Sequence, residues 1–139
     1  MGRVINLETA GKERTTLVRA VALAVRELLQ QSEVDECTKD LAAFIVLGLE
    51  SIEGTVDGSV QAWEKRGYWL KADRFRMEWN WTGVLAGRMR TAVLQEDWSA
   101  AAVLAVQIAQ KLQDVEVPKR NRIGTPWVGA YEHLQAQVR

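Results

Sequence analysis

The chain has 139 residues, a mass of 15.6 kDa and 18 basic against 18 acidic side chains, so its formal net charge is zero. This length predicts one domain over residues 1–139, large enough to bury a hydrophobic core. Apolar residues make up 47% of the chain, which excludes intrinsic disorder. The longest uncharged apolar stretch, residues 98–110, is too short to span a membrane, so we expect no membrane contact.

A single cysteine, Cys37, leaves no possibility of an internal disulfide, and no basic-then-apolar leader opens the chain. Both features predict a reducing, cytoplasmic location. Charge is unevenly distributed, with 8 basic and 11 acidic side chains in residues 1–66 and 10 basic and 7 acidic in residues 67–139. We interpret this as an acidic half that folds against a basic half, because a nucleic-acid-binding domain is usually strongly basic.

The residue pattern is helical throughout. Both prolines lie in the last quarter of the chain, and no run of β-branched residues alternates with polar ones, which argues against strands. After an arm over residues 1–9, the spacing predicts a first helix over 11–31. One face of this helix is apolar: Leu17, Val21, Val25 and Leu28.

A second helix is predicted over 35–66, with Ser32 or Asp35 as its cap. Its apolar residues follow a seven-residue repeat that favours packing at shallow angles in a bundle: Leu41, Ile45, Leu49, Ile52, Val56, Val60 and Trp63. Three glycines lie inside this helix: Gly48, Gly54 and Gly58. We interpret them as sites where a neighbouring helix approaches closely, with a kink as the alternative. Gly67 is the predicted stop.

Further helices are predicted over 69–95 and over 98–114, the latter capped by Asp97. After a loop, Thr125 and Pro126 carry the cap-then-proline signature that predicts a short last helix over 127–137. The sequence therefore predicts an all-α fold, an up-and-down four-helix bundle with a short fifth C-terminal helix.

The third helix carries two apolar faces. One face contains Leu70, Met77, Trp81, Val84, Leu85 and Ala92, and the other contains Phe75, Trp79, Thr82, Ala86, Met89 and Val93. A helix of a lone bundle needs only one such face. We expect the C-terminal segment, with Trp127 and Tyr131, to cover the second face, and a second copy of the chain is the alternative.

Charged residues accompany these apolar faces. Glu50, Glu53, Asp57 and Glu64 form a ridge on the second helix, while Arg74 and Arg88 lie within the Leu70–Met77 face of the third. Charges close to a core persist when they are paired. We therefore predict buried ion pairs between Glu64 and Arg74 and between Glu50 or Glu53 and Arg88.

The same carboxylates offer an alternative, catalytic interpretation. Glu50 and Glu53 lie one helical turn apart, a spacing that can hold Mg²⁺ or Mn²⁺. This Glu-x-x-Glu resembles half of the signature of the all-α nucleotide pyrophosphohydrolases, which act on nucleoside triphosphates. The resemblance implies a metal-dependent phosphohydrolase. In this interpretation Asp57 and Glu78 substitute geometrically for the other metal ligands, and Arg74 or Arg88 clamps a phosphate. The second half of the signature is missing, because Trp81 follows three residues after Glu78.

Other metal sites and nucleophilic pairs lack the residues they need, since His133 is the single histidine and Cys37 has no partner at ligand spacing. Basic and aromatic residues do alternate from Arg66 to Arg90, as in surfaces that bind single-stranded nucleic acid. A loop before a helix start can hold a phosphate, which makes one further group the candidate binding patch of a nucleic-acid complex: Lys119, Arg120, Arg122 and Trp127.

Taken together, the sequence favours a non-catalytic module that binds itself or another protein, with self-association through the third helix. No cofactor is expected, with Mg²⁺ or Mn²⁺ required only by a phosphohydrolase. Nucleic acid is a less favoured partner, as for the small α-helical subunits of nucleic-acid-binding complexes.

Overall fold

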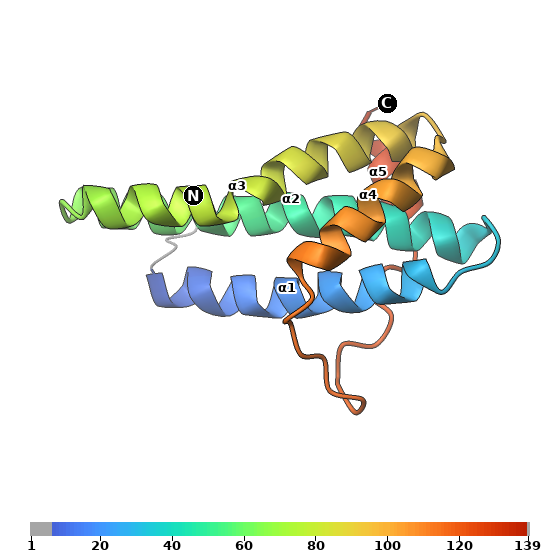
Figure 1. The fold of residues 1–139 in the computed structure, drawn as a ribbon, viewed down its shortest axis with the longest axis horizontal. Helices are drawn as coiled ribbons and strands as arrows, with labels where there is room; N and C mark the ends of the chain where they lie inside the picture. The colour runs from blue at the N-terminus through green and yellow to red at the C-terminus, as the bar shows by residue number, and fades with distance from the viewer. Residues whose placement is uncertain (1–6, 139) are drawn as a thin grey trace.

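A computed structural model describes residues 7–138 of the chain, and over this range the fold is all-helical, without strands. It contains five helices, shown in Figure 1: α1 (Leu7–Leu29), α2 (Glu36–Lys65), α3 (Trp69–Leu94), α4 (Trp98–Lys111) and α5 (Ala130–Ala136). The predicted arm over 1–9 is too long, because α1 already begins at Leu7. Ala10 is fully buried there, so packing extends this helix beyond the predicted start. Residues 1–6 of the arm lie outside the described residues.

The central helix is α2, which contacts α1, α3 and α5, while α4 contacts α1 and α3. The predicted seven-residue repeat of α2 forms the core: it is fully buried from Leu41 to Ile52 and nearly so at Val56 and Val60. Val21 and Val25 of α1 pack against it. The apolar patterns of these two helices therefore predicted the core correctly.

Two of the three glycines within α2 have different environments. A side chain at Gly48 would collide with Val21 of α1, so the predicted close approach of a neighbouring helix is confirmed there. Gly54 is exposed, and a side chain would meet nothing within 4 Å, so the same explanation is wrong for that position.

Three of the helix boundaries predicted from capping residues and glycine are confirmed. Asp35 caps α2 by accepting a hydrogen bond from the Thr38 amide at 2.9 Å, and Asp97 caps α4 by accepting one from the Ala100 amide at 3.1 Å. Gly67 follows α2 with φ of +80°, a backbone conformation that favours glycine. These signals mark both ends of α2 and the start of α4.

The predicted start of the last helix at Thr125–Pro126 is wrong. Gly129 has φ of +84°, which separates the turn at Pro126 from α5. The cap comes instead from Asp40 of α2, whose carboxylate accepts hydrogen bonds from the amides of Gly129 at 3.1 Å and Tyr131 at 3.0 Å. A side chain 89 residues earlier in the chain thus anchors α5 on α2.

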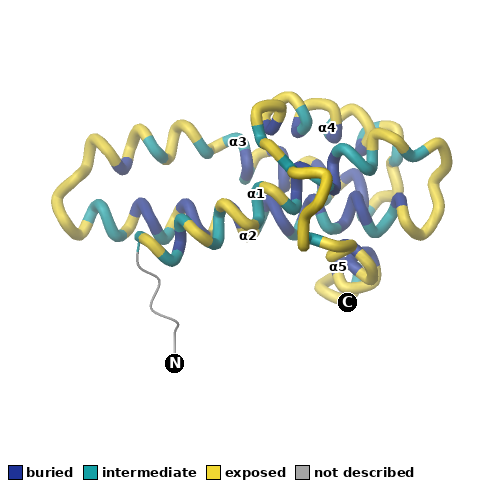
Figure 2. Tube along the Cα trace, turned by 90° about the horizontal axis from the view of Figure 1, so that it is seen from below, coloured by how far each residue is buried: buried dark blue, intermediate teal, exposed yellow. Residues whose placement is uncertain are grey.

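The fourth helix is much shorter than the third, with 14 residues against 26. In Figure 1, α4 crosses from the end of α3 toward the middle of α1 and leaves the amino-terminal half of α3 without a covering helix. Figure 2 shows the consequence, because exposed residues dominate α3 at the end where it follows the turn from α2. No helix within residues 7–138 combines the length and apolar character needed to cross a membrane.

Candidate functional site

The amino-terminal half of α3 turns its apolar residues outward. Ala72 is the one buried residue between 69 and 81, whereas six residues are buried between 82 and 94. Leu70 is 65% exposed and Met77 is 77% exposed. The face of α3 that packs on α2 is the other predicted one, with Thr82, Ala86, Met89 and Val93 buried and Phe75 and Trp79 partly buried.

The second predicted face of α3, which we expected the C-terminal segment to cover, packs mainly on α2, with α5 contributing at its far end, and the C-terminal segment does not reach the exposed Leu70–Met77 region. Tyr131 and Leu134 of α5 pack in a cluster with Met89 and Val93 near the far end of α3, and Trp127 is buried in the main core. Asp40 holds α5 on α2, away from the hairpin between α2 and α3. A surface that we term the open α3 face is therefore left uncovered: Leu70, Lys71, Arg74, Met77 and Glu78.

Two shallow grooves meet on the open α3 face. The first has a volume of about 630 Å³ and is lined by the end of α2 and the start of α3: Trp63, Gly67, Tyr68, Trp69, Leu70, Lys71, Arg74, Phe75 and Glu78. The second has about 450 Å³ and lies between α3 and the end of α4: Met77, Glu78, Asn80, Trp81, Val84, Leu85, Gln107, Gln110 and Lys111. Glu78 borders both, so the hollow continues along α3 up to the end of α4.

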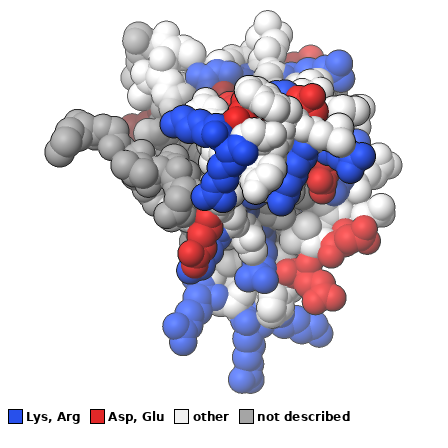
Figure 3. Space-filling view, turned by 90° about the vertical axis from the view of Figure 1, so that its left-hand side faces the viewer, with Lys and Arg blue, Asp and Glu red and all other residues white. Residues whose placement is uncertain are grey.

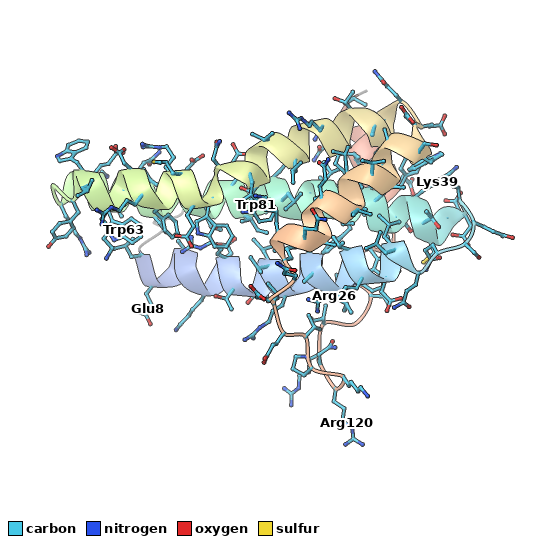
Figure 4. All side chains as sticks on the ribbon, in the orientation of Figure 1. Glu8, Arg26, Lys39, Trp63, Trp81 and Arg120 are labelled. Atoms are coloured by element: carbon cyan, nitrogen blue, oxygen red, sulfur yellow. The ribbon has the colours of Figure 1, made fainter. Side chains whose placement is uncertain are left out.

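Trp63, Phe75 and Trp81 line this hollow, and Trp79 packs beside them. Trp63 and Phe75 meet edge to face with 4.8 Å between their ring centroids, and Trp79 stacks with Trp81 at 6.5 Å. Figure 4 shows Trp63 and Trp81 on the side of α3 that looks toward α1. Edge-to-face and offset-stacked pairs are the favoured arrangements of aromatic rings, so these rings form a stable group.

Arg14 of α1 packs against these aromatic rings. Its guanidinium lies 4.7 Å from the Phe75 ring centroid and 5.7 Å from that of Trp79. Its Nη1 donates to the Thr55 carbonyl and the Ser59 hydroxyl, both at 3.3 Å. Burial lowers the pKa of Arg14, and the negative charge of Glu78 opposes this shift. Arg14 therefore joins α1, α2 and α3 beneath the open α3 face, a role that the sequence did not reveal.

The two predicted ion pairs named the correct carboxylates, Glu64 and Glu50, but the wrong arginines. Arg76 lies 3.4 Å from Glu64, and Arg90 lies 3.0 Å from Glu50, whereas the structure gives no ion pair to Arg74 or Arg88 within residues 7–138. The true partners come two residues later, a rotation of about 200° around the helix. The pairs are not buried either, because the four side chains are 27–50% exposed.

The remaining candidate residues for metal-dependent chemistry are spread out. The Glu53 carboxylate lies against Gly83 of α3, and Asp57 and Glu78 are exposed on different helices. Between residues 7 and 138, no three Asp, Glu, His or Cys side chains lie close enough together to hold a metal ion. The phosphohydrolase interpretation stays a prediction, with Glu50 already engaged by Arg90.

The candidate nucleic-acid patch divides into two parts. Lys119, Arg120 and Arg122 are exposed in the loop before α5, and Figure 4 shows Arg120 projecting away from the helices. Trp127 is only 7% exposed, so its ring is not available for stacking on a base. The loop residues thus form a basic protrusion without its predicted aromatic member. Cys37 at the start of α2 and His133 in α5 are both exposed.

Figure 3 looks onto the end of the molecule where α2 turns into α3, and both basic and acidic side chains lie around uncharged surface there. The open α3 face therefore combines exposed apolar groups, aromatic side chains and a border of charge. Such a combination is characteristic of surfaces that bind proteins. The chain matches no protein-family model, no curated protein and no solved structure.

Proposed function

We propose that the protein is a non-catalytic helical module that binds another polypeptide helix on the open α3 face. The observation that carries this proposal is the exposure of Leu70 and Met77 on a well-formed helix, beside two continuous grooves. Full burial of a side chain of this kind contributes about 1.5–3 kcal/mol, and soluble monomers rarely leave contiguous apolar patches uncovered.

The position of the face supports a helix as the occupant. Helix α4 contacts α3 and α1 and ends at Lys111, which lines the second groove beside the open α3 face. We assign the fold to the up-and-down four-helix bundles on the alternating order of α1 to α4 and their short connections. In this assignment, the fourth position is half empty, and a helix from a partner fills the remaining half.

Photo-crosslinking tests this proposal in the cells that make the protein. A photoreactive phenylalanine analogue at Met77 is expected to form a covalent adduct with a protein upon irradiation. The same analogue at Val103, which is also exposed but lies on the outer side of α4, serves as the matched control and is expected to form none. Equal labelling at both positions, or no adduct at position 77, contradicts the proposal.

A further inference from the structure

The loop between α4 and α5 carries a cluster of basic side chains that the proposed function does not use. Lys119, Arg120 and Arg122 are exposed, and the structure gives none of them an ion pair within residues 7–138. Their segment projects beyond α1 in Figure 1, on the side of the molecule away from α3. We term residues 118–124 the basic protrusion.

Both stems of the basic protrusion are anchored on the helices. Arg26 of α1 donates from Nη2 to the carbonyl oxygens of Leu112 at 3.3 Å and Val115 at 2.6 Å. Val115 and Val117 are partly buried and pack against the main core. At the other end of the loop, Trp127 is buried in the same core. The stems therefore hold the basic protrusion in one place on the molecule.

Asn121 closes the turn between the two arginines. Its Nδ2 donates to the Pro118 carbonyl at 2.8 Å, and its Oδ1 accepts a hydrogen bond from the Ile123 amide at 3.0 Å. Bonds of this kind between an asparagine side chain and nearby backbone stabilise tight turns. Gly124 follows with φ of +69°, a conformation that favours glycine. The chain thus displays three cations on a turn that holds its own shape.

The charges along the loop leave the tip positive. The acidic residues of the loop, Asp114 and Glu116, lie on the stem that leaves α4, and no acidic residue occurs from 117 to 131. Arg26 adds a positive charge at the base of that stem, where two carbonyl oxygens accept from its guanidinium. A polyanion is therefore attracted to the tip of the loop rather than to its α4 stem.

We infer that the basic protrusion binds the phosphate backbone of a nucleic-acid duplex. Guanidinium and ammonium groups pair with phosphate oxygens, and such contacts carry the sequence-independent part of nucleic-acid affinity. Trp127 is buried, so the loop lacks the exposed aromatic ring on which the bases of single strands stack. The binding is therefore directed at a duplex and is independent of base sequence.

The composition of the tip favours a nucleic acid over a protein or a lipid surface. Between residues 115 and 125, none of the large apolar side chains is exposed. Protein interfaces are built around an apolar and aromatic centre, which this loop does not offer. Stable attachment to a membrane needs a lipid anchor or an apolar face in addition to basic residues. A projecting tip that offers charge alone suits a partner that is bound through charge alone.

Three phosphate contacts set the expected dependence of binding on salt. The logarithm of the association constant should fall with the logarithm of the salt concentration with a slope of about −2.7, which is about −0.9 for each contact. Between about 50 and 200 mM salt, this slope weakens binding by about 40-fold.

Fluorescence anisotropy of a labelled DNA duplex tests the inference on the purified full-length protein. The triple variant K119Q/R120Q/R122Q should lose most of the affinity and its salt slope should approach zero. The matched control removes the same number of positive charges from exposed positions outside the loop and should bind nearly as tightly as the unmodified protein: Lys65→Gln, Arg66→Gln and Arg88→Gln. Circular dichroism checks that both variants are folded. Equal weakening in the two variants, or an unmodified protein that does not bind the duplex at low salt, overturns the inference.

Asn121→Ala tests the part that the turn contributes, because it keeps every charge of the loop. Binding should weaken several-fold, since an open loop must be ordered when it meets the duplex. Unchanged binding overturns the role of the turn.

Other polyanions test the identity of the partner. At the same salt concentration, the duplex should bind more tightly than single-stranded DNA, poly-glutamate or vesicles that contain phosphatidylserine. Tighter binding of any of these three overturns the assignment to a duplex. The result is independent of the proposed function, which a different surface carries.

Discussion

Arg90 of α3 holds Glu50 of α2 through one nitrogen, with Nη1 donating to both carboxylate oxygens at 3.0 and 3.1 Å. Its Nη2 donates to the Gln137 side chain at 3.1 Å, just beyond α5. One guanidinium therefore links two long helices to the end of the chain, on the side of α3 opposite to the open α3 face.

The first prediction concerns this link. Arg90→Ala is expected to lower the free energy of unfolding by about 0.5–1 kcal/mol, because the pair is partly exposed and water screens it. Arg88→Ala is the matched control, with an expected change near zero, since Arg88 is exposed and has no ion pair within residues 7–138. Urea titrations measure both. An equal loss in the two variants would contradict the rotation of α3 seen in the structure.

The second prediction compares two glycines of the same helix. Gly48→Ala is expected to destabilise the protein by about 1–3 kcal/mol, because the added methyl group collides with the β-branched side chain of Val21. Gly54→Ala is expected to stabilise it by up to about 1 kcal/mol, since alanine favours an exposed helix and meets no neighbour. Thermal unfolding of both variants tests this prediction. A gain in stability for Gly48→Ala would contradict the close contact between Gly48 and Val21.

The third prediction concerns the distant cap of α5. Asp40→Ala is expected to cost about 1 kcal/mol, because the amides of Gly129 and Tyr131 lose their acceptor. Hydrogen exchange should quicken in α5 while the rest of α2 keeps its protection. Asp57→Ala, an exposed carboxylate on the same helix, is the control. Unchanged exchange in α5 after the Asp40 substitution would show that packing alone holds that helix.

The fourth prediction is a dependence of stability on alkaline pH. Burial raises the pKa of Tyr131, and the nearby Glu96, which accepts a hydrogen bond from the phenol at 3.4 Å, adds to the shift. Since the folded pKa exceeds the unfolded value near 10, this contribution is present below pH 10 and is lost as the pH rises through the folded pKa. Tyr131→Phe should flatten the loss of stability above pH 10. Parallel curves for the two proteins would contradict this role of Tyr131.

The sequence predicted the features that depend on local pattern. The apolar repeat of α2 gave its core residues, and the capping side chains Asp35 and Asp97 gave two helix starts, because both signals act within one or two turns. It also placed Glu50 and Glu64 correctly as partners of α3, since an antiparallel hairpin around Gly67 fixes which residues lie level.

The sequence did not determine which side of α3 turns inward. Both faces carry apolar residues, so the sequence pattern does not show whether Trp79 or Met77 packs on α2. The inward side of α3 also decides which arginines reach α2, and the true partners lie two residues after the predicted ones. Long-range contacts were also missed. The capping of α5 by Asp40 and the insertion of Arg14 between helices depend on how distant segments meet, which the local spacing of these residues does not encode.

The central claim is that the open α3 face mediates association and is dispensable for folding. Photo-crosslinking in the cells that make the protein tests it most directly, with the photoreactive analogue at Met77 compared with Val103, an exposed control position on α4. A protein adduct is expected at position 77 and none at position 103, and Met77→Glu should unfold at the same temperature as the unmodified protein. Equal labelling at both positions, or a loss of folding in Met77→Glu, would contradict the account.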